Sequence, residues 1–557
     1  MTTVEMTGHY KKEYRFGQRK KTENEELIGP EQLYQCDGTP GFLTERNRNA
    51  SRRLQIPELN SGFDTAYWYA GTEITEITGD EYGIRAAFKE DGRGQIPLSF
   101  KCDVPEEGNY LVTVQITAEK EVDPALIFIG RRRLYLCRKM EKGEHVCESY
   151  VVNVCPVIAR NQSSVLEDLS IDVTVIGEGV HLNYVRVEKA HCRTIYIAGD
   201  STVTDQNTDY PYVPGASYSG WGQMLSAFLG NEFAVSNHSH SGLTTESFRS
   251  EGHYRVMRKR LHAGDLCLIQ FGHNDQKLDK LKAEGGYRDR LIRYFREIRA
   301  KGAVPVLVTP LSRNSWKGID GTYNDLLEEY DRVCIETGWE YKVPVVRLHE
   351  LSRAFVISRG REDAKRFFYP SDYTHTNDYG AYYFAETVAR ELAAQRLISS
   401  VRENGKWQPP KVIAKPAAPL HLASVPNPAE ERLFENLQRP EDDLTRTEAL
   451  EFVIQSMHFF PTNVYNDVFD DVVGHETYAG AVECACQNDI IPKEIVSGHI
   501  FRPTEPVTGR EFEEFVINGY HSRISGSPGE NTFPEDFIQS KRVKRSTAAE
   551  ICRRLHI

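Results

Sequence analysis

The sequence predicts a multidomain chain with an N-terminal β-sandwich, a central α/β domain built on a parallel sheet, and a small C-terminal α-helical domain. Three observations predict this fold. Residues 1–190 carry strand-like alternation, residues 191–400 alternate short apolar runs with helix-length segments, and residues 431–557 contain repeated helical starts. A chain of 557 residues is also too long for a single hydrophobic core.

The N-terminal part is expected to form a jelly-roll-like sandwich. The segments "YLVTVQITAE" and "IDVTV" alternate apolar and polar residues, a period of two that is typical of strands with one buried face. Turn signals such as "EDGRG" and "IGEG" separate such runs. The predicted buried face contains Val112, Val114, Ile116, Ala118, Ile171, Val173 and Val175.

The central part contains five short, nearly continuous apolar runs: "TIYIA", "FAVSN", "LCLIQF", "VPVLVT" and "VPVVRL". Between them lie amphipathic segments such as "YRDRLIRYFREIRAKG", which ends at Gly302. Its apolar positions are Leu291, Ile292, Phe295 and Ile298. Buried strands alternating with helices predict a five-stranded parallel sheet covered on both faces, closed by the helix "GAYYFAETVARELAAQRL".

The C-terminal part follows a proline-rich stretch at residues 401–430, which is expected to be a stiff linker. Beyond it, "LTRTEALEFVI" (444–454) resembles "VTGREFEEFVI" (507–517) and, more loosely, "VKRSTAAEIC" (543–552). Each segment places Thr, Arg or Glu before an apolar stripe. This repetition predicts a small helical domain with several similar helix starts.

Composition excludes several classes of function. The net charge of −12 argues against non-specific binding of nucleic acid or anionic lipid, and no apolar run is long enough to suggest a membrane span. The first residues, "MTTVEMTGHYKKEYRFG", lack the apolar core of a signal peptide, so a cytoplasmic location is expected. Eleven scattered cysteines fit reduced thiols, and Cys484 and Cys486 lack a second pair to complete a zinc site. We expect no metal and no cofactor.

Polar residues stand where the predicted strands end. Ser201 follows the first strand, Gly242 the second and Asn274 the third. Asp372 and His375 come between the fifth strand and the closing helix. Because ligands of open parallel sheets bind beyond the carboxyl ends of the strands, these residues are expected to converge.

The residue types are those of acyl transfer. A neutral imidazole at His375 could take the proton of Ser201, and Asp372 could fix its tautomer. The backbone N–H groups of Ser201 and Gly242 and the side-chain amide of Asn274 could donate to the oxyanion. Taken singly, Ser201 would better suit a helix cap, and only the other residues favour a nucleophile.

Four blocks carry a resemblance to a known family. The residues Gly199-Asp200-Ser201, Gly242, Gly272-His273-Asn274-Asp275 and Asp372-x-x-His375 stand in the order found in SGNH (GDSL-type) hydrolases. The versions "AGDSTV", "GWGQML", "IQFGHNDQK" and "DYTHTNDYGA" resemble the rhamnogalacturonan acetylesterase branch. The resemblance covers residues 194 to about 398. It implies a flavodoxin-like α/β/α fold and metal-free removal of acetyl groups from pectic sugars. It also implies a catalytic Ser201, Asp372 and His375, with Gly242 and Asn274 in the oxyanion hole.

The flanking parts have resemblances of their own. The N-terminal part resembles galactose-binding-like modules that accompany some bacterial esterases of this branch. The C-terminal part is similar to S-layer homology modules, through "LTRTEA" and "FRPTEPVTGRE". Such modules usually bind cell-wall polymers, and without a signal peptide we expect a packing or assembly role here instead.

Candidate substrate contacts lie in the loops around the predicted site. Aromatic faces suit sugar rings, and arginines suit a uronate carboxylate. His273 has two interpretations, a structural role beside Asn274 or a contact to substrate. Asp378 is a rival for the triad acid, but we expect it to cap the closing helix. The candidates are Tyr210, Tyr212, Tyr218, His273, Arg249 and Arg313.

The sequence thus predicts a serine carbohydrate esterase acting on acetylated pectic, rhamnogalacturonan-type or related plant saccharides. Two other hypotheses remain: an esterase of the same superfamily acting on a lipid or thioester, and a glycan-binding scaffold with an inactive hydrolase domain. The tyrosines and arginines of the site loops count against the lipid substrate. The oligomeric state stays open, and a homo-oligomer is compatible with the sequence.

Overall fold

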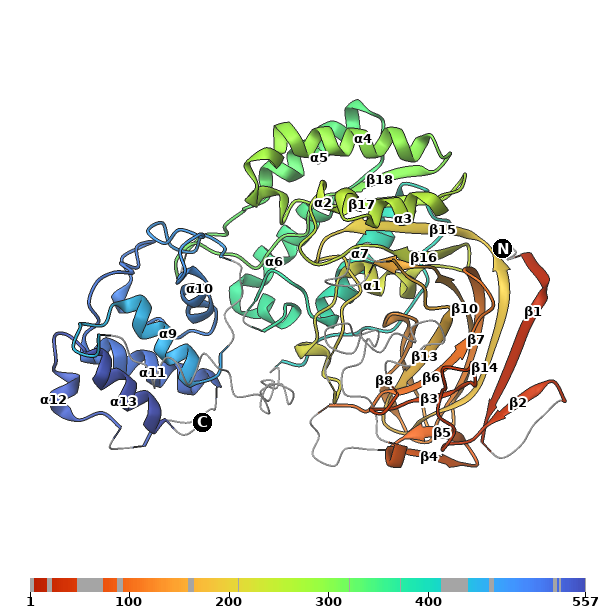
Figure 1. The fold of residues 1–557 in the computed structure, drawn as a ribbon, viewed down its shortest axis with the longest axis horizontal. Helices are drawn as coiled ribbons and strands as arrows, with labels where there is room; N and C mark the ends of the chain where they lie inside the picture. Colours follow the sequence, from red (N-terminus) through yellow and green to blue (C-terminus); the bar gives the residue numbers. More distant parts are fainter. Residues whose placement is uncertain are drawn as a thin grey trace. The chain divides into compact units, whose positions relative to one another are not determined.

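The computed structural model describes residues 5–17, 23–47, 74–87, 94–158, 165–208, 210–319, 321–370, 372–411, 439–459, 465–523, 528–529 and 532–555. The chain forms two compact units (Figure 1). The first comprises Met1–Ser312, Leu327–Phe355 and His375–Lys411, and the second comprises Arg313–Leu326, Val356–Thr374 and Val412–Ile557.

The first unit begins with two β-sheets that share one apolar core. Val112, Val114 and Ile116 lie fully buried in this core, as the alternation predicted. The larger sheet contains β1 (Glu5–Phe16), β2 (Glu25–Ile28), β4 (Ile77–Asp80), β5 (Gly83–Ala86), β7 (Gly108–Ala118), β10 (His145–Val154) and β14 (Val180–His191). The smaller contains β3 (Gly41–Leu43), β6 (Leu98–Asp103), β8 (Val122–Ile129), β9 (Arg133–Met140) and β13 (Ser170–Ile176), and β11 (Val157–Ile158) pairs with β12 (Val165–Leu166).

The five predicted central strands form one parallel sheet of order β16-β15-β17-β18-β19. The first strand of this sheet along the chain, β15, therefore lies inside it, with β16 on one side and β17 on the other. Such a reversal of strand order opens a ligand site at the carboxyl ends of the strands. The strands are β15 (Arg193–Gly199), β16 (Phe233–Asn237), β17 (Leu266–Gln270), β18 (Val304–Val308) and β19 (Val345–Val346).

Helices cover both faces of this sheet. The helices α3, α4 and α5 share a core with the side chains of β15, and α1 and α7 pack together on the other face (Figure 1). On α4 the buried stripe contains Tyr294 as well as the predicted Leu291, Phe295 and Ile298, while Ile292 is only half-buried. The helices are α1 (Trp221–Met224), α2 (Ser247–Ser250), α3 (His253–Arg260), α4 (Arg288–Arg299), α5 (Glu328–Glu340), α6 (Leu348–Ala364) and α7 (Asp378–Ala394). Across the described ranges, no helix has the length and apolar character needed to cross a bilayer.

The C-terminal part of the second unit is helical, with α9 (Arg446–Ser456), α10 (Ala479–Gln487), α11 (Gly509–Arg523), α12 (Glu535–Ile538) and α13 (Arg545–Arg554). The three predicted helix starts coincide with α9, α11 and α13. The residues before these helices are joined in a closed ring of backbone hydrogen bonds, from Leu444 to Val543, from Val543 to Val507 and from Val507 to Leu444. Most of the predicted linker, residues 412–430, lies outside the described residues.

Candidate active site

The structure brings Ser201 and His375 together although 174 residues separate them. Ser201 follows the inner strand β15, and its Oγ lies 2.7 Å from Nε2 of His375. Both side chains are half-buried, so a substrate can reach them. The ring of Tyr218 packs edge-on against the imidazole with 5.7 Å between centroids. The 2.7 Å between Ser201 Oγ and His375 Nε2 is the separation that proton transfer from a hydroxyl to an imidazole requires.

The turn that presents Ser201 is held by its neighbour Asp200. The Asp200 carboxylate is fully buried and accepts hydrogen bonds from the backbone N–H of Thr202, at 3.0 Å, and from its hydroxyl, at 2.7 Å. Burial raises the pKa of Asp200, but nearby His273 and the Thr202 bonds outweigh it, so the pKa falls below its usual value. An ionised Asp200 therefore stabilises the turn.

Gly242 and Asn274, the predicted oxyanion donors, belong to connected loops. Gly242 is exposed and has φ +83°, a left-handed conformation that glycine adopts without strain. The side-chain amide of Asn274 donates to the backbone carbonyl of Leu243 at 3.1 Å, which ties it to the Gly242 loop. Their role as donors to an oxyanion stays a prediction.

We expect Asn274→Ala to lower kcat for an aryl acetate by about 10²–10³-fold with little change in KM, because an oxyanion donor acts mainly in the transition state. Steady-state kinetics measure this, and an unchanged melting temperature excludes unfolding as the cause. A kcat equal to that of the wild type would remove Asn274 from the oxyanion hole.

Asp275, the residue after Asn274, has a buried carboxyl group whose pKa is raised. Its Oδ1 accepts bonds from the N–H and the hydroxyl of Thr245, at 3.0 and 2.5 Å. Burial is the largest influence on it and outweighs these bonds, so the pKa of Asp275 rises to about 7. At acidic pH the folded protein therefore retains a proton that the unfolded chain loses near pH 4.

The free energy of unfolding is consequently expected to fall as pH rises from about 4 to about 7, by up to about 4 kcal/mol from this group. Asp275→Asn carries no charge at any pH and should flatten this part of the stability curve. Melting temperatures between pH 4.5 and 8 measure it, with the exposed Asp279→Asn as the control. Parallel curves for wild type and Asp275→Asn would contradict the raised pKa.

Asp372 and Asp378, the rival acids, have different surroundings. Asp372 is buried, and its Oδ1 accepts the backbone N–H of Thr374 at 3.1 Å, in the turn that leads to His375. Asp378 is the first residue of α7 and was expected to be its cap. That expectation is wrong, because the cap is Asn377, whose side chain accepts the N–H of Gly380 at 3.1 Å. The role of Asp372 as the triad acid stays a prediction.

The three candidate tyrosines differ in what they contact. The Tyr210 hydroxyl donates to Oε2 of Glu76 at 2.5 Å, and Tyr218 is half-buried against His375. Tyr212 is fully buried and donates to Asp378, so its ring belongs to the core rather than to a surface. A sugar platform at Tyr210 or Tyr218 stays a prediction.

The other candidates are engaged by protein groups. His273 is buried with Nδ1 3.5 Å from Oδ2 of Asp200. Arg249 pairs with both carboxylate oxygens of Glu297, at 2.9 and 3.1 Å. In the second unit, Arg313 is buried and donates to Asn466 Oδ1 at 2.8 Å. Contacts of these three side chains to substrate stay predictions.

Arg249 also lines a basic surface groove of about 780 Å³ between α3 and α4. Seven basic and two acidic side chains line it, which stands out on a chain of net charge −12. The basic residues are Arg249, Arg255, Arg258, Lys259, Arg290, Arg293 and Lys301. A groove of this charge suits an anionic ligand.

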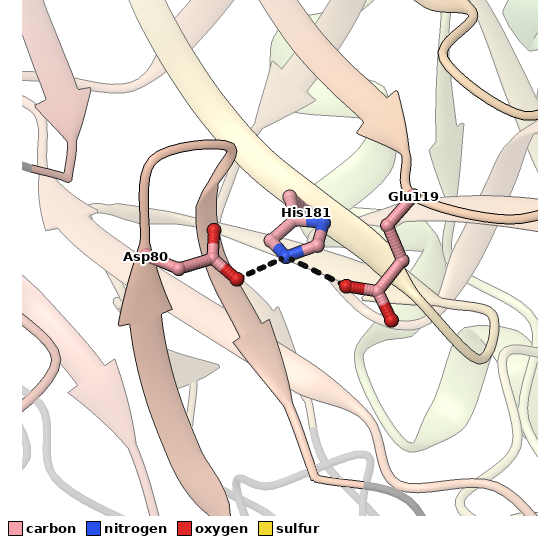
Figure 2. A group of neighbouring side chains, drawn as sticks. All are labelled: Asp80, Glu119 and His181. Carbon is pink, nitrogen blue, oxygen red and sulfur yellow. Dashed lines mark hydrogen bonds and ion pairs between the residues drawn. The ribbon is translucent and has the colours of Figure 1, made fainter.

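Asp80, Glu119 and His181, none of which the sequence singled out, form a cluster in the β-domain (Figure 2). Nε2 of the buried His181 lies 3.1 Å from Asp80 and 3.5 Å from Glu119. These residue types can bind divalent cations, but Arg85 Nε lies 3.5 Å from the same Glu119 oxygen, so an ion-pair network accounts for the cluster. Only strand pairing brings these three residues together, so no local sequence signal could have found them.

Known proteins share the central domain. A model of the GDSL-like lipase/acylhydrolase family matches residues 197–383. The rhamnogalacturonan acetylesterase RhgT of Bacillus subtilis (strain 168) is 33% identical over 211 residues, which cover 36% of this chain and 88% of that protein. A rhamnogalacturonan acetylesterase of Emericella nidulans is 25% identical over 233 residues, covering 36% of this chain and 86% of its own. A crystal structure of protein YxiM from Bacillus subtilis aligns with 70% of this chain and 99% of its own, at 21% identity and a TM-score of 0.36.

Proposed function

Because the chain belongs to the GDSL-like lipase/acylhydrolase family, we propose that it is a serine carbohydrate esterase. It would remove O-acetyl groups from pectic, rhamnogalacturonan-type or related plant oligosaccharides. The observation that carries the proposal is the 2.7 Å contact between Ser201 Oγ and His375 Nε2 at the carboxyl end of the inner strand.

The proposed mechanism proceeds through an acyl-enzyme. His375 takes the proton of Ser201 as its Oγ attacks the acetyl carbonyl, while Asp372 stabilises the imidazolium. The oxyanion accepts hydrogen bonds from the N–H groups of Ser201 and Gly242 and from Asn274. The imidazolium of His375 then protonates the sugar oxygen as its bond to the acetyl carbon breaks, which leaves an acetylated Ser201. Water gives a proton to the same imidazole as it attacks the acetyl carbon, and the bond to Oγ breaks, so acetate leaves and Ser201 takes the proton back.

Two observations support an acetylated acidic saccharide as substrate. The curated relatives named above are rhamnogalacturonan acetylesterases and match the chain over its central domain. The basic groove that Arg249 lines suits the carboxylates of uronic acids. The resemblances of the flanking parts to galactose-binding-like and S-layer homology modules stay predictions.

The substrate is tested by acetate release from acetylated rhamnogalacturonan oligosaccharides and from acetylated xylan, a largely neutral polymer. We expect preference for the first, with a KM that rises with salt because its charges are screened. A parallel series from acetyl to octanoyl esters should show activity falling with chain length. Preference for long acyl chains would point to a lipid substrate, and inactivity on every ester would point to a binding role.

A further inference from the structure

The hairpin between β8 and β9 carries three consecutive arginines, Arg131, Arg132 and Arg133, and reaches from the β-domain into the hydrolase domain of the same unit. Arg132 occupies the turn with φ +52°, a left-handed conformation that costs energy for a residue with a Cβ. Its N–H donates to the carbonyl of Gly130 at 2.7 Å. A strained residue in a tight turn indicates that the rest of the structure constrains it.

The guanidinium of Arg132 is fully buried and contacts three separate segments. Its Nη1 binds both carboxylate oxygens of Asp378, at 3.0 and 2.8 Å. Its Nε donates to the carbonyl of Gln206 at 2.9 Å, and Nη2 donates to the carbonyl of Tyr218. A planar group with five donors can join three segments in this way, and a lysine ammonium cannot reproduce the fork.

These three segments carry the candidate catalytic residues or their direct contacts. The side chain of Gln206 donates to the backbone carbonyl of Ser201 at 3.2 Å. The ring of Tyr218 packs against the imidazole of His375. Asp378 begins α7, close after His375 in the chain.

The segments around His375 are also bonded to each other. The N–H of Ser219 donates to the carbonyl of Thr376 at 3.1 Å, and the Thr376 hydroxyl returns a 2.6 Å bond to the carbonyl of Ser219. Arg132 thus meets both sides of the Ser201–His375 pair from a domain that carries neither residue.

We propose that Arg132 is a positioning residue of the esterase site, through which the β-domain sets the distance between the Ser201 hydroxyl and the His375 imidazole. The inference rests on the function proposed above. A hydrogen bond of 2.7 Å between nucleophile and base is sensitive to small displacements, and an error of about 1 Å in such a geometry lowers the rate by about 100-fold. The β-domain is then part of the catalytic unit, not an independent attachment.

The test compares Arg132→Lys, which keeps the charge, with Arg133→Lys in the same hairpin. Arg133 is also buried, and its hydrogen bonds go to the carbonyls of Val235 and Asn153. Its Nε lies 3.9 Å from Oδ2 of Asp205, an ion pair that the lysine ammonium can retain. Arg132→Lys is expected to lower kcat for an aryl acetate by about 100-fold, with KM changed by less than about threefold. Arg133→Lys is expected to keep the wild-type kcat per folded molecule.

Rescue separates positioning from folding. Arg132→Gly removes the side chain at a left-handed turn that glycine favours, so the hairpin can keep its shape. Guanidinium ion, at a concentration that leaves the wild-type melting temperature unchanged, is expected to restore much of the lost kcat in this variant only. If guanidinium does not restore kcat and Arg133→Lys loses as much kcat as Arg132→Lys, Arg132 only holds the two domains together. That result would overturn the proposal.

A second readout does not depend on the natural substrate. The rate at which a fluorophosphonate reagent labels Ser201 reports the activation of the hydroxyl by His375, whatever ester the enzyme uses. Labelling of the wild type without acetate release would refute the proposed substrate. The role of Arg132 would then still be tested by the labelling rates of wild type and Arg132→Lys. Equal labelling rates in wild type and Arg132→Lys would overturn the positioning role of Arg132 and leave the esterase function standing. A wild type that is not labelled would refute both the positioning role and the serine esterase function.

Discussion

Ser201→Ala is expected to abolish ester hydrolysis while the fold stays intact. The hydroxyl is the only part of the side chain that the substitution removes, and its Oγ is the atom in contact with His375 Nε2. In serine hydrolases the loss of the nucleophile costs about 10⁶-fold in kcat, and the binding residues alone retain about 10³-fold over water. Residual activity should therefore fall below what ordinary assays with an aryl acetate detect.

The matched control is Ser400→Ala, which makes the same change at an exposed position beyond α7. Both variants should melt at the wild-type temperature, and only Ser201→Ala should lose activity and fluorophosphonate labelling. Wild-type hydrolysis by Ser201→Ala at the wild-type melting temperature would end the serine mechanism.

The second large effect is expected from Asp372→Asn, which should lower kcat by about 10³–10⁴-fold without unfolding the protein. An asparagine can hold the imidazole in the wrong tautomer and cannot stabilise the imidazolium that forms. The substitution keeps an oxygen for the N–H of Thr374, so the turn before His375 can persist. Activity assays and chemical denaturation of the same samples measure the two quantities separately.

Asp378→Asn provides the contrast. Its carboxylate is buried against Arg132 and accepts the hydroxyl of Tyr212. Burial raises the pKa of Asp378, and the nearby Arg132 opposes that rise. Breaking this ion pair should lower the free energy of unfolding by about 3–5 kcal/mol, since a buried guanidinium is left without its counter-charge.

The loss of kcat in Asp378→Asn should be smaller than in Asp372→Asn, at most about 100-fold, because Asp378 would act through position alone. If Asp378→Asn instead lost all activity at full stability while Asp372→Asn stayed active, the triad acid would be Asp378.

Much of the fold follows from local patterns. Each of the five central strands appears as a short apolar run, and each was found where the sequence predicted it. The three C-terminal helix starts were also predicted. At α9 and α11 a threonine, Thr445 or Thr508, caps the helix shortly before its apolar stripe, whereas α13 begins after Lys544 with no side-chain cap. The strand-end rule placed Ser201 and His375 at the same edge of the sheet, and the structure brings their side chains into contact.

The errors arose where a distant partner competes with a local preference. Asp378 has the sequence context of a helix cap, yet its carboxylate binds Arg132, which lies 246 residues earlier, and Asn377 takes the capping role. Arg132 itself stands in a turn between two strands, where an arginine is ordinarily exposed. Nothing in its neighbours indicates that it is buried.

The sequence by itself determined the five central strands, the closing helix and the three C-terminal helix starts, together with the candidate residues for acyl transfer. Those properties depend on periodicity and on chemical type, both of which are visible within a few residues. Only the tertiary structure decided which of those groups meet, that Ser201 lies within hydrogen-bond distance of His375, and that a β-domain arginine is buried against the segments that flank them. The reason is physical: contact and burial depend on how remote segments pack, and a charge finds its counter-charge only after the chain has folded.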